Sequence, residues 1–239
     1  MDRPEVIINM AATADGKTAS AKREYPRLTS SFDRSRMERL RASVDAVLVG
    51  AETVRAIDPP LHLRDAASVE ARQRAGKHQG LIHVVLSGSG RVPGTAKALT
   101  APGAQTHIVA TTETGQAALA GIGRDVEVWA LGKNRVDLTT LLRRLKARGV
   151  SRLLVEGGAE TNGGFLDADL VDELYLTIAP TLLGGRNAPQ LIGGEGLAMV
   201  ERRQLTLVEL TREGDELYCH YRVARNTAPS HPSPGGFLA

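Results

Sequence analysis

Aromatic side chains are scarce in this sequence of 239 residues, where they make up only 3%. Its hydrophobic core must therefore be built from aliphatic side chains and alanine. Single-stranded nucleic acids are usually bound by stacking their bases on aromatic rings, so the composition argues against that function. The net charge is also small, at +3 from 30 basic and 27 acidic residues. This excess suits an anionic small molecule better than a nucleic-acid duplex.

Cysteine is equally scarce, since Cys219 is the only one. An intrachain disulfide and a zinc site made of cysteines are therefore excluded, and we expect a protein of a reducing compartment, the cytoplasm. The N-terminal segment lacks the basic start and the long apolar core of a signal peptide. No apolar run approaches the roughly 20 residues that span a membrane, so we expect no membrane partner.

Several common catalytic motifs are missing too. The sequence has neither the P-loop pattern nor H-E-x-x-H, and its six histidines are scattered, so neither a P-loop kinase nor a metal site is expected. Gly88 and Gly90 follow an apolar run, but the next glycine, Gly94, comes one position too late for the dinucleotide fingerprint G-x-G-x-x-G. Pro93 also interrupts the helix that should begin there.

Short apolar runs predict nine strands, at residues 6–10, 46–49, 82–86, 106–110, 126–130, 153–155, 174–178, 205–211 and 216–223. The first seven are apolar on both faces, as in strands buried between helices. The last strand alternates between apolar and polar residues, which is typical of a half-exposed antiparallel strand. Glu213, Gly214 and Asp215 supply the turn before it.

Helical patterns alternate with the early strands. Ser30 and Asp33 have the spacing of a capping box, and Met37, Leu40 and Val44 then form an apolar stripe. A second stripe at Leu138, Leu141, Leu142 and Leu145, closed by Arg148 and Gly149, predicts another helix. Residues 161–168 are expected to form one more, and residues 66–74 have weak helical character. This order predicts an α/β fold, with a mostly parallel twisted sheet flanked by helices and an antiparallel C-terminal hairpin. We expect one domain over residues 1–225 and a flexible tail, rich in Pro, Gly and Ser, over residues 226–239.

The turn at Glu156, Gly157 and Gly158 carries the most chemical information. An apolar strand ends there and leads directly into a helix, so backbone N–H groups approach whatever sits at the turn. The N-terminus of a helix favours an anion, commonly a phosphate. A carboxylate beside a phosphate is repelled, so Glu156 should point toward a different ligand.

Four stretches in this order resemble the reductase domain of riboflavin biosynthesis, a member of the dihydrofolate reductase-like superfamily. They are the Asp15-Gly16-Lys17 turn, V-G-A-x-T-V-R-x-x-D-P-x-L-x-x-R at residues 49–64, V-E-G-G at residues 155–158, and L-V-D-E-L-x-x-x-x-A-P-x-L-L-G-G at residues 170–185. The resemblance extends from about Val6 to Tyr221. No deaminase domain, which often precedes this reductase, is present in the sequence, so the expectation is a stand-alone enzyme.

The resemblance implies NADPH as the cofactor and a phosphorylated ribosylaminopyrimidine as the substrate, whose ribosyl group is reduced to ribityl by hydride transfer to C1′. The implied catalytic residues are Asn9 and Glu156. The implied cofactor-binding residues are Gly50, Thr53, Ser87, Gly157 and Gly158, and the implied substrate-binding residues are Thr29, Arg41, Asp58 and Arg64. The resemblance also implies a homodimer.

The sequence pattern also supports a substrate-binding role for Arg41, because this residue lies on the flank of the apolar stripe of its helix. With Arg64 it could form a forked phosphate site. The alternative is an arginine whose stem extends along a buried face. Glu156 could pass a proton if burial raised its pKa, although a bound water serves equally well.

One departure from the family pattern puts the exact substrate in question. Family members commonly have two polar residues before the proline, whereas this chain has Ile57 and Asp58. Two alternatives therefore stay open beside the riboflavin reductase. One is a paralogous NADPH-dependent reductase of another heterocyclic or pterin-like substrate, and the other is a non-catalytic nucleotide-binding protein.

Overall fold

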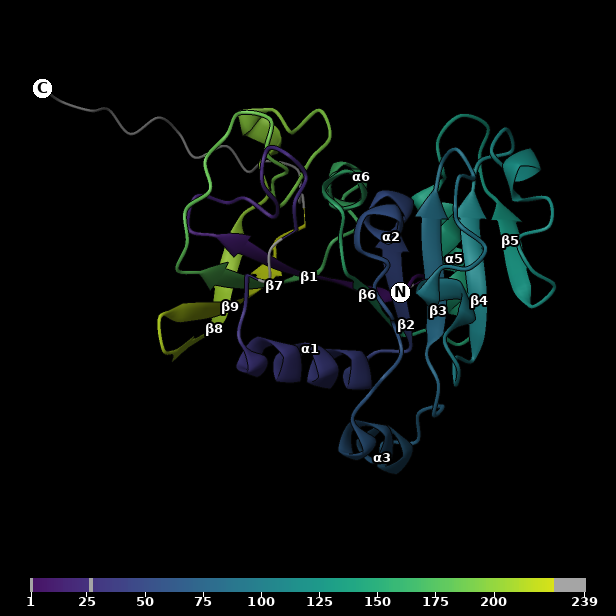
Figure 1. Ribbon diagram of the computed structural model, residues 1–239, viewed down its shortest axis with the longest axis horizontal. Helices are drawn as coiled ribbons and strands as arrows, with labels where there is room; N and C mark the ends of the chain where they lie inside the picture. Colours follow the sequence, from purple (N-terminus) through teal and green to yellow (C-terminus); the bar gives the residue numbers. More distant parts are fainter. Residues whose placement is uncertain (1, 26–27, 226–239) are drawn as a thin grey trace, which may run out of the picture.

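A single nine-stranded sheet forms the centre of the molecule (Figure 1), in a computed structural model that describes residues 2–25 and 28–225. The strand order is β5-β4-β3-β2-β6-β1-β7-β9-β8. The strands are β1 (Glu5–Thr13), β2 (Ala46–Gly50), β3 (Ile82–Ser87), β4 (Thr106–Thr111), β5 (Val126–Ala130), β6 (Arg152–Val155), β7 (Glu173–Ala179), β8 (Leu205–Glu213) and β9 (Glu216–Val223).

Strands β1 to β7 run parallel, and β8 and β9 form the antiparallel hairpin at one end. All nine predicted strands and the predicted fold class are confirmed. The predicted tail, residues 226–239, lies outside the described residues. No helix in the described part of the chain is long and apolar enough to cross a membrane.

Helices cover both faces of the sheet. They are α1 (Ser31–Ser43), α2 (Ala51–Ile57), α3 (Ala66–Arg74), α4 (Lys97–Thr100), α5 (Leu138–Ala147) and α6 (Ala159–Asp167). Leucines of α5 and Phe165 of α6 pack on one face, while Val54 of α2 and Leu99 of α4 pack on the other. Both clusters are mostly aliphatic, as the shortage of aromatic residues requires. The short helix α4 was not predicted.

The N-terminus of α1 is capped by Ser30 and is also tied to the C-terminal hairpin. Ser30 accepts a hydrogen bond from the backbone N–H of Phe32 at 3.2 Å, as a capping residue does. Asp33, however, accepts from the Thr177 hydroxyl at 2.6 Å, and the Ser30 backbone N–H donates to Glu216 at 2.8 Å. The predicted capping box is therefore wrong, because a carboxylate from β9 takes the place of Asp33.

Burial on both faces holds only for the central strands. β5 is an edge strand, and Trp129 is its one buried residue. In β9, Tyr218 is fully buried although it lies in the more polar half of the alternating pattern. The N-terminal half of α1 covers that face, with Phe32 stacked edge-to-face on Tyr218 at 5.1 Å. The prediction that all seven parallel strands are buried on both faces is therefore wrong at the edge.

The sheet changes its winding direction between β2 and β6. The chain leaves β2 through α2 toward β3, but it leaves β6 through α6 toward β7 on the other side. The two connections diverge and open a crevice at the carboxyl ends of the strands, which is where open α/β sheets bind ligands. The Glu156-Gly157-Gly158 turn lies at this crevice.

Two histidines lie side by side on neighbouring strands. His83 of β3 is fully buried, and its ring lies edge-to-face on that of His107 of β4 at 5.3 Å. Burial, reinforced by the charge of His107, lowers the pKa of His83 to about 3. His83 is therefore neutral in the folded protein at neutral pH.

We expect acid to destabilise the protein through His83. Unfolding returns its pKa to about 6.5, so below that pH the unfolded chain binds a proton that the folded chain does not. The melting temperature should therefore fall from about pH 7 to about pH 4, and His83→Leu should flatten that slope. The exposed His78, changed to Gln, is the control. An unchanged slope in His83→Leu, measured by circular dichroism, would contradict this account.

Candidate active site

Three neighbouring cavities lie at the carboxyl edge of the sheet. The first, which we call the α2–α6 cavity, has a volume of about 650 Å³ and lies between the first turns of α2 and α6 and the loops after β3 and β5. The second, the α1 cavity, has a volume of about 580 Å³ and is lined by Asn9, Arg41, Arg64 and Glu156, among others. The third, the junction cavity, also measures about 580 Å³.

The junction cavity connects the other two. It shares Glu52 and Gly158 with the α2–α6 cavity. It shares Thr53, Ile57 and Glu156 with the α1 cavity. The three hollows therefore form one continuous groove across the crevice, and the Gly157-Gly158 turn lies near its middle.

Glycine is required where the strands meet at this turn. The Gly50 N–H donates to the Gly157 carbonyl at 2.9 Å, and a Cβ on Gly50 would collide with the Thr161 hydroxyl. A Cβ on Gly157 would lie 2.8 Å from the sulfur of Met10, and φ there is +86°, a region that favours glycine. The peptide bond from Gly157 to Gly158 is cis. These contacts let the backbone itself form the wall of the groove.

The first turn of α6 faces the α2–α6 cavity without a side-chain cap. Gly158 is the N-cap and has no side chain to occupy the free N–H groups. Two carboxylates line the same wall, but both are engaged elsewhere. Glu52 pairs with Arg23 at 2.6 Å, and Glu160 accepts from the Gly194 N–H at 3.3 Å. Neither carboxylate therefore occupies the free N–H groups of the first turn, which can still donate to an anion.

The opposite wall of the α2–α6 cavity comes from the end of β3. Ser87 is buried and lines the cavity, and Gly88 follows it. A Cβ on Gly88 would meet nothing within 4 Å, so the backbone there borders open space. A cavity of this volume, with a free helix N-terminus on one side and a glycine-serine loop on the other, fits a dinucleotide.

Glu156 is held by a buried ion pair. Arg41 Nε and Nη2 donate to its two carboxylate oxygens, each at 2.7 Å. The side chains are only 3% and 10% exposed. Burial opposes the charge on Arg41, but the charge of Glu156 and its hydrogen bonds outweigh this and raise the pKa of Arg41. The third guanidinium nitrogen, Nη1, donates to the His62 carbonyl at 3.2 Å.

This pairing changes the expected role of Arg41. All three of its guanidinium nitrogens already have protein partners, so the forked phosphate site with Arg64 is not formed in the structure. Arg41 lies on the buried face of α1 rather than on its flank, with 2% of the residue exposed. Arg64 itself is exposed on the wall of the α1 cavity.

The other expected site residues divide into two groups. Asn9 lines the α1 cavity, Thr29 the junction cavity, and Thr53 both. Asp58 lines none of the three, because its backbone is left-handed with φ of 42° and its carboxylate accepts from the Lys97 N–H at 2.8 Å. The expectation that Asp58 contacts the substrate is therefore not supported by its placement.

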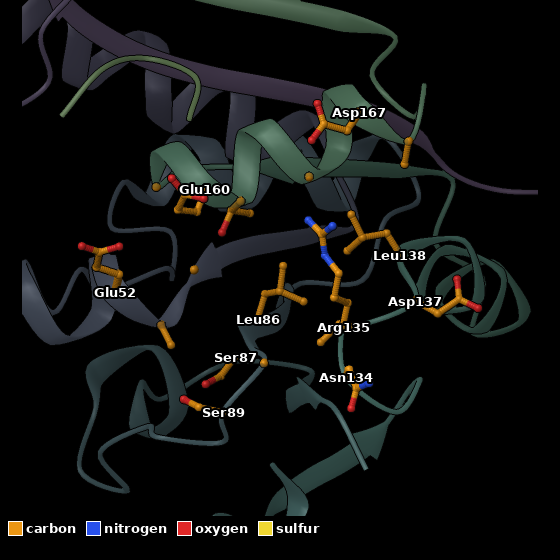
Figure 2. A pocket seen from close by; sticks show the side chains of 18 of the residues that line it. Glu52, Leu86, Ser87, Ser89, Asn134, Arg135, Asp137, Leu138, Glu160 and Asp167 are labelled. Atoms are coloured by element: carbon orange, nitrogen blue, oxygen red, sulfur yellow. The ribbon is translucent and has the colours of Figure 1, made fainter. Parts of the chain in front are cut away.

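Some lining residues could not be found from the sequence. Met10 and Ile57 form an apolar wall that the α1 and junction cavities share, and Ile57 is 49% exposed. Arg135 extends into the α2–α6 cavity from the loop before α5 (Figure 2). No motif marks Met10 or Arg135, which come from β1 and from a distant loop, whereas Ile57 lies within the motif at residues 49–64 and was noted there as a departure from the family pattern. In the described part of the chain no cluster of three or more His, Cys, Asp or Glu side chains is placed to hold a metal ion.

Comparison with known proteins agrees with this geometry. Residues 4–218 match the family described as the RibD C-terminal domain. The chain belongs to the RibD C-terminal domain family. The predicted resemblance is thereby confirmed.

Two archaeal relatives match along nearly their whole length. The proteins of Archaeoglobus fulgidus and Methanothermobacter thermautotrophicus are 34% and 35% identical to this chain, over 89% and 92% of it and 95% and 99% of their own lengths. Both are named 2,5-diamino-6-ribosylamino-4(3H)-pyrimidinone 5′-phosphate reductase.

Solved structures show the same fold. RibD of Acinetobacter baumannii superposes with a TM-score of 0.74 at 27% identity, over 94% of this chain and 59% of the RibD chain. A pyrimidine reductase-like protein of Corynebacterium diphtheriae gives a TM-score of 0.79 at 21% identity, over 93% of both chains. The second likeness concerns the fold alone.

We expect the Arg41–Glu156 pair to behave as a coupled unit. Arg41→Met leaves a carboxylate without its partner and should lower the free energy of unfolding by about 3 kcal/mol. The double variant Arg41→Met/Glu156→Leu should recover a large part of that loss, because the uncompensated charge is gone. Urea titrations of the two single variants and the double variant measure the coupling. Additive losses would contradict the pairing.

Proposed function

We propose that this protein is an NADPH-dependent reductase that converts the ribosyl group of 2,5-diamino-6-ribosylamino-4(3H)-pyrimidinone 5′-phosphate to ribityl in riboflavin biosynthesis. The two archaeal relatives that match along nearly their whole length carry this reductase name. The continuous groove supports the proposal, because hydride transfer needs a dinucleotide and a second ligand to meet end to end.

The position of Glu156 is the observation that carries the proposal. It lines both the junction cavity and the α1 cavity, and Arg41 fixes both of its oxygens. A dinucleotide whose pyrophosphate lies at the start of α6 directs its nicotinamide into the junction cavity. The α1 cavity then takes the pyrimidine substrate, with Glu156 at the border of the two ligands.

Each part of the groove has a separate task. The cofactor supplies the hydride when it is bound. Gly157, Gly158 and the first turn of α6 bind its pyrophosphate. The hydride forms a C–H bond at C1′ of the opened ribose, while the electrons of the C=N bond move to nitrogen, which takes up a proton. Glu156 orients the ribose hydroxyls or the ring amine for this step, and because it is ionised in its pair with Arg41, that proton comes from a water that it binds.

The substrate phosphate is assigned to Arg64. Its guanidinium lies on the open wall of the α1 cavity, where Arg34 is a second cation. Arg41 lines the same cavity, but its donors serve Glu156 and His62. Arg64 with Arg34 is therefore better placed to bind a phosphate dianion than Arg64 with Arg41.

We expect the purified protein to oxidise NADPH when it is given the diaminopyrimidinone phosphate. Glu156→Gln keeps the size of the side chain but removes the charge, and should lower kcat by about 100-fold or more. The dissociation constant for NADPH should stay within about 2-fold of that of the unchanged protein, since the interactions of the cofactor phosphates are retained. The matched control is Glu70→Gln, an exposed glutamate of α3 outside the groove.

The same assay separates the alternatives. Turnover with a pterin-like or other heterocyclic substrate, but not with the diaminopyrimidinone phosphate, would favour the paralogous reductase. Ile57 is the residue that motivates this alternative, because it places an apolar side chain on the substrate wall. Binding of NADPH without turnover of any of these compounds would favour the non-catalytic protein.

We propose that the protein is a homodimer that pairs through β8, and that it works in the cytoplasm. β8 is the edge strand at the hairpin end of the sheet, and Leu207, Val208 and Leu210 on it are 50%, 47% and 56% exposed. An edge strand with such apolar residues is a template for association. The two faces of β8 are exposed along most of its length, so a second copy could cover it.

We expect Leu210→Lys to shift the protein from dimer to monomer, because a charge would be buried in the interface. Sedimentation equilibrium measures the change. Val200→Lys is the matched control, since Val200 is 87% exposed and lies outside β8. A dimer that survives Leu210→Lys, or a monomeric unchanged protein, would refute the β8 interface.

A further inference from the structure

Arg135 is the cation of the α2–α6 cavity whose guanidinium has no partner among the described residues. The cavity is lined by two arginines. Arg55 donates to the Arg91 carbonyl at 2.7 Å, whereas the side chain of Arg135 makes no hydrogen bond or ion pair within residues 2–25 and 28–225. Figure 2 shows it extending from its loop into the cavity, between Leu86 and Leu138 and toward α6.

Four carboxylates line the cavity with Arg135, but none of them forms an ion pair with it within the described residues. Glu52 and Glu160 are engaged with Arg23 and the Gly194 N–H. Asp137 caps α5, where it accepts from the Thr140 N–H at 2.9 Å and from the Thr140 hydroxyl at 2.6 Å. Asp167 lies on α6, on the same cavity wall (Figure 2), and forms no ion pair with Arg135. Arg135 is exposed on the cavity wall, and within the described residues its guanidinium donors stay free to bind an anion.

The direction in which a dinucleotide lies along the groove determines which part of it meets Arg135. With the pyrophosphate at the start of α6 and the nicotinamide in the junction cavity, the adenosine half extends the other way. It then lies between the loop at Ser87–Ser89 and the loop at Asn134–Leu138, which line the far part of the same cavity. Arg135 belongs to the second of these loops.

We propose that Arg135 binds the 2′-phosphate on the adenosine ribose and thereby selects NADPH over NADH. An arginine near this ribose is a general means of accepting the 2′-phosphate. The guanidinium fork matches two phosphate oxygens, and the charge-assisted hydrogen bonds that form are stronger than those to the neutral hydroxyl of NADH. This assignment rests on the proposed dinucleotide site, but not on the identity of the pyrimidine.

The experiment measures binding without any pyrimidine. Arg135→Gln removes the charge and keeps a polar side chain, and titration calorimetry gives the dissociation constants for NADPH, NADH, 2′,5′-ADP and 5′-ADP. We expect Arg135→Gln to weaken NADPH and 2′,5′-ADP by about 10-fold or more. NADH and 5′-ADP should stay within about 2-fold of their values for the unchanged protein. Arg135→Lys should recover part of the NADPH affinity, since it retains the charge but not the fork.

The control is Arg143→Gln, an exposed arginine of α5 that does not line the cavity. Equal weakening of NADPH and NADH would overturn the proposal, because Arg135 would then serve the pyrophosphate. Unchanged affinity for NADPH would overturn it as well. Selective loss of NADPH in a protein that fails to reduce the pyrimidine would uphold the assignment of Arg135 and refute the proposed substrate.

Discussion

The buried ion pair between Arg41 and Glu156 is the interaction on which the groove depends. It joins α1 to the end of β6, and its third donor joins both to the loop at His62. A carboxylate at a strand end would otherwise rotate freely or turn toward the free N–H groups of α6. The fork of Arg41 removes that freedom, because two parallel hydrogen bonds define the plane of the carboxylate.

At the same crevice, two glycines act through the absence of a side chain. Gly50 and Gly157 bring the ends of β2 and β6 into direct hydrogen-bond contact, and no side chain is tolerated between them. In the proposed arrangement the backbone forms the phosphate side of the crevice, whereas Glu156 and Arg41 form the substrate side. In that arrangement Glu156 alone separates the proposed cofactor side from the proposed substrate side, and its pairing with Arg41 holds the carboxylate away from the turn.

Ile57 places an apolar side chain in the site where the family pattern commonly has a polar one. Ile57 lies on the wall shared by the α1 and junction cavities, while Asp58 turns away to bind the Lys97 N–H. Of the carboxylates that line these two cavities, only Glu156 lines both. Among the described residues, Glu156 is therefore the carboxylate to which we assign the orientation of the substrate at the border of the two cavities. Ile57 supplies an apolar surface on the wall that they share.

The sequence by itself determined the strands, the main helices and the glycine turn, because apolar periodicity and glycine placement are local properties. It also pointed to Glu156, since a charge before two glycines is locally unusual. Only the tertiary structure decided the partner of Arg41, the direction of Asp58, the carboxylate that caps α1, and the presence of Arg135 in the cavity. Each of these depends on residues distant in sequence, and the packing of helices on the sheet, rather than any local pattern, sets which charges meet.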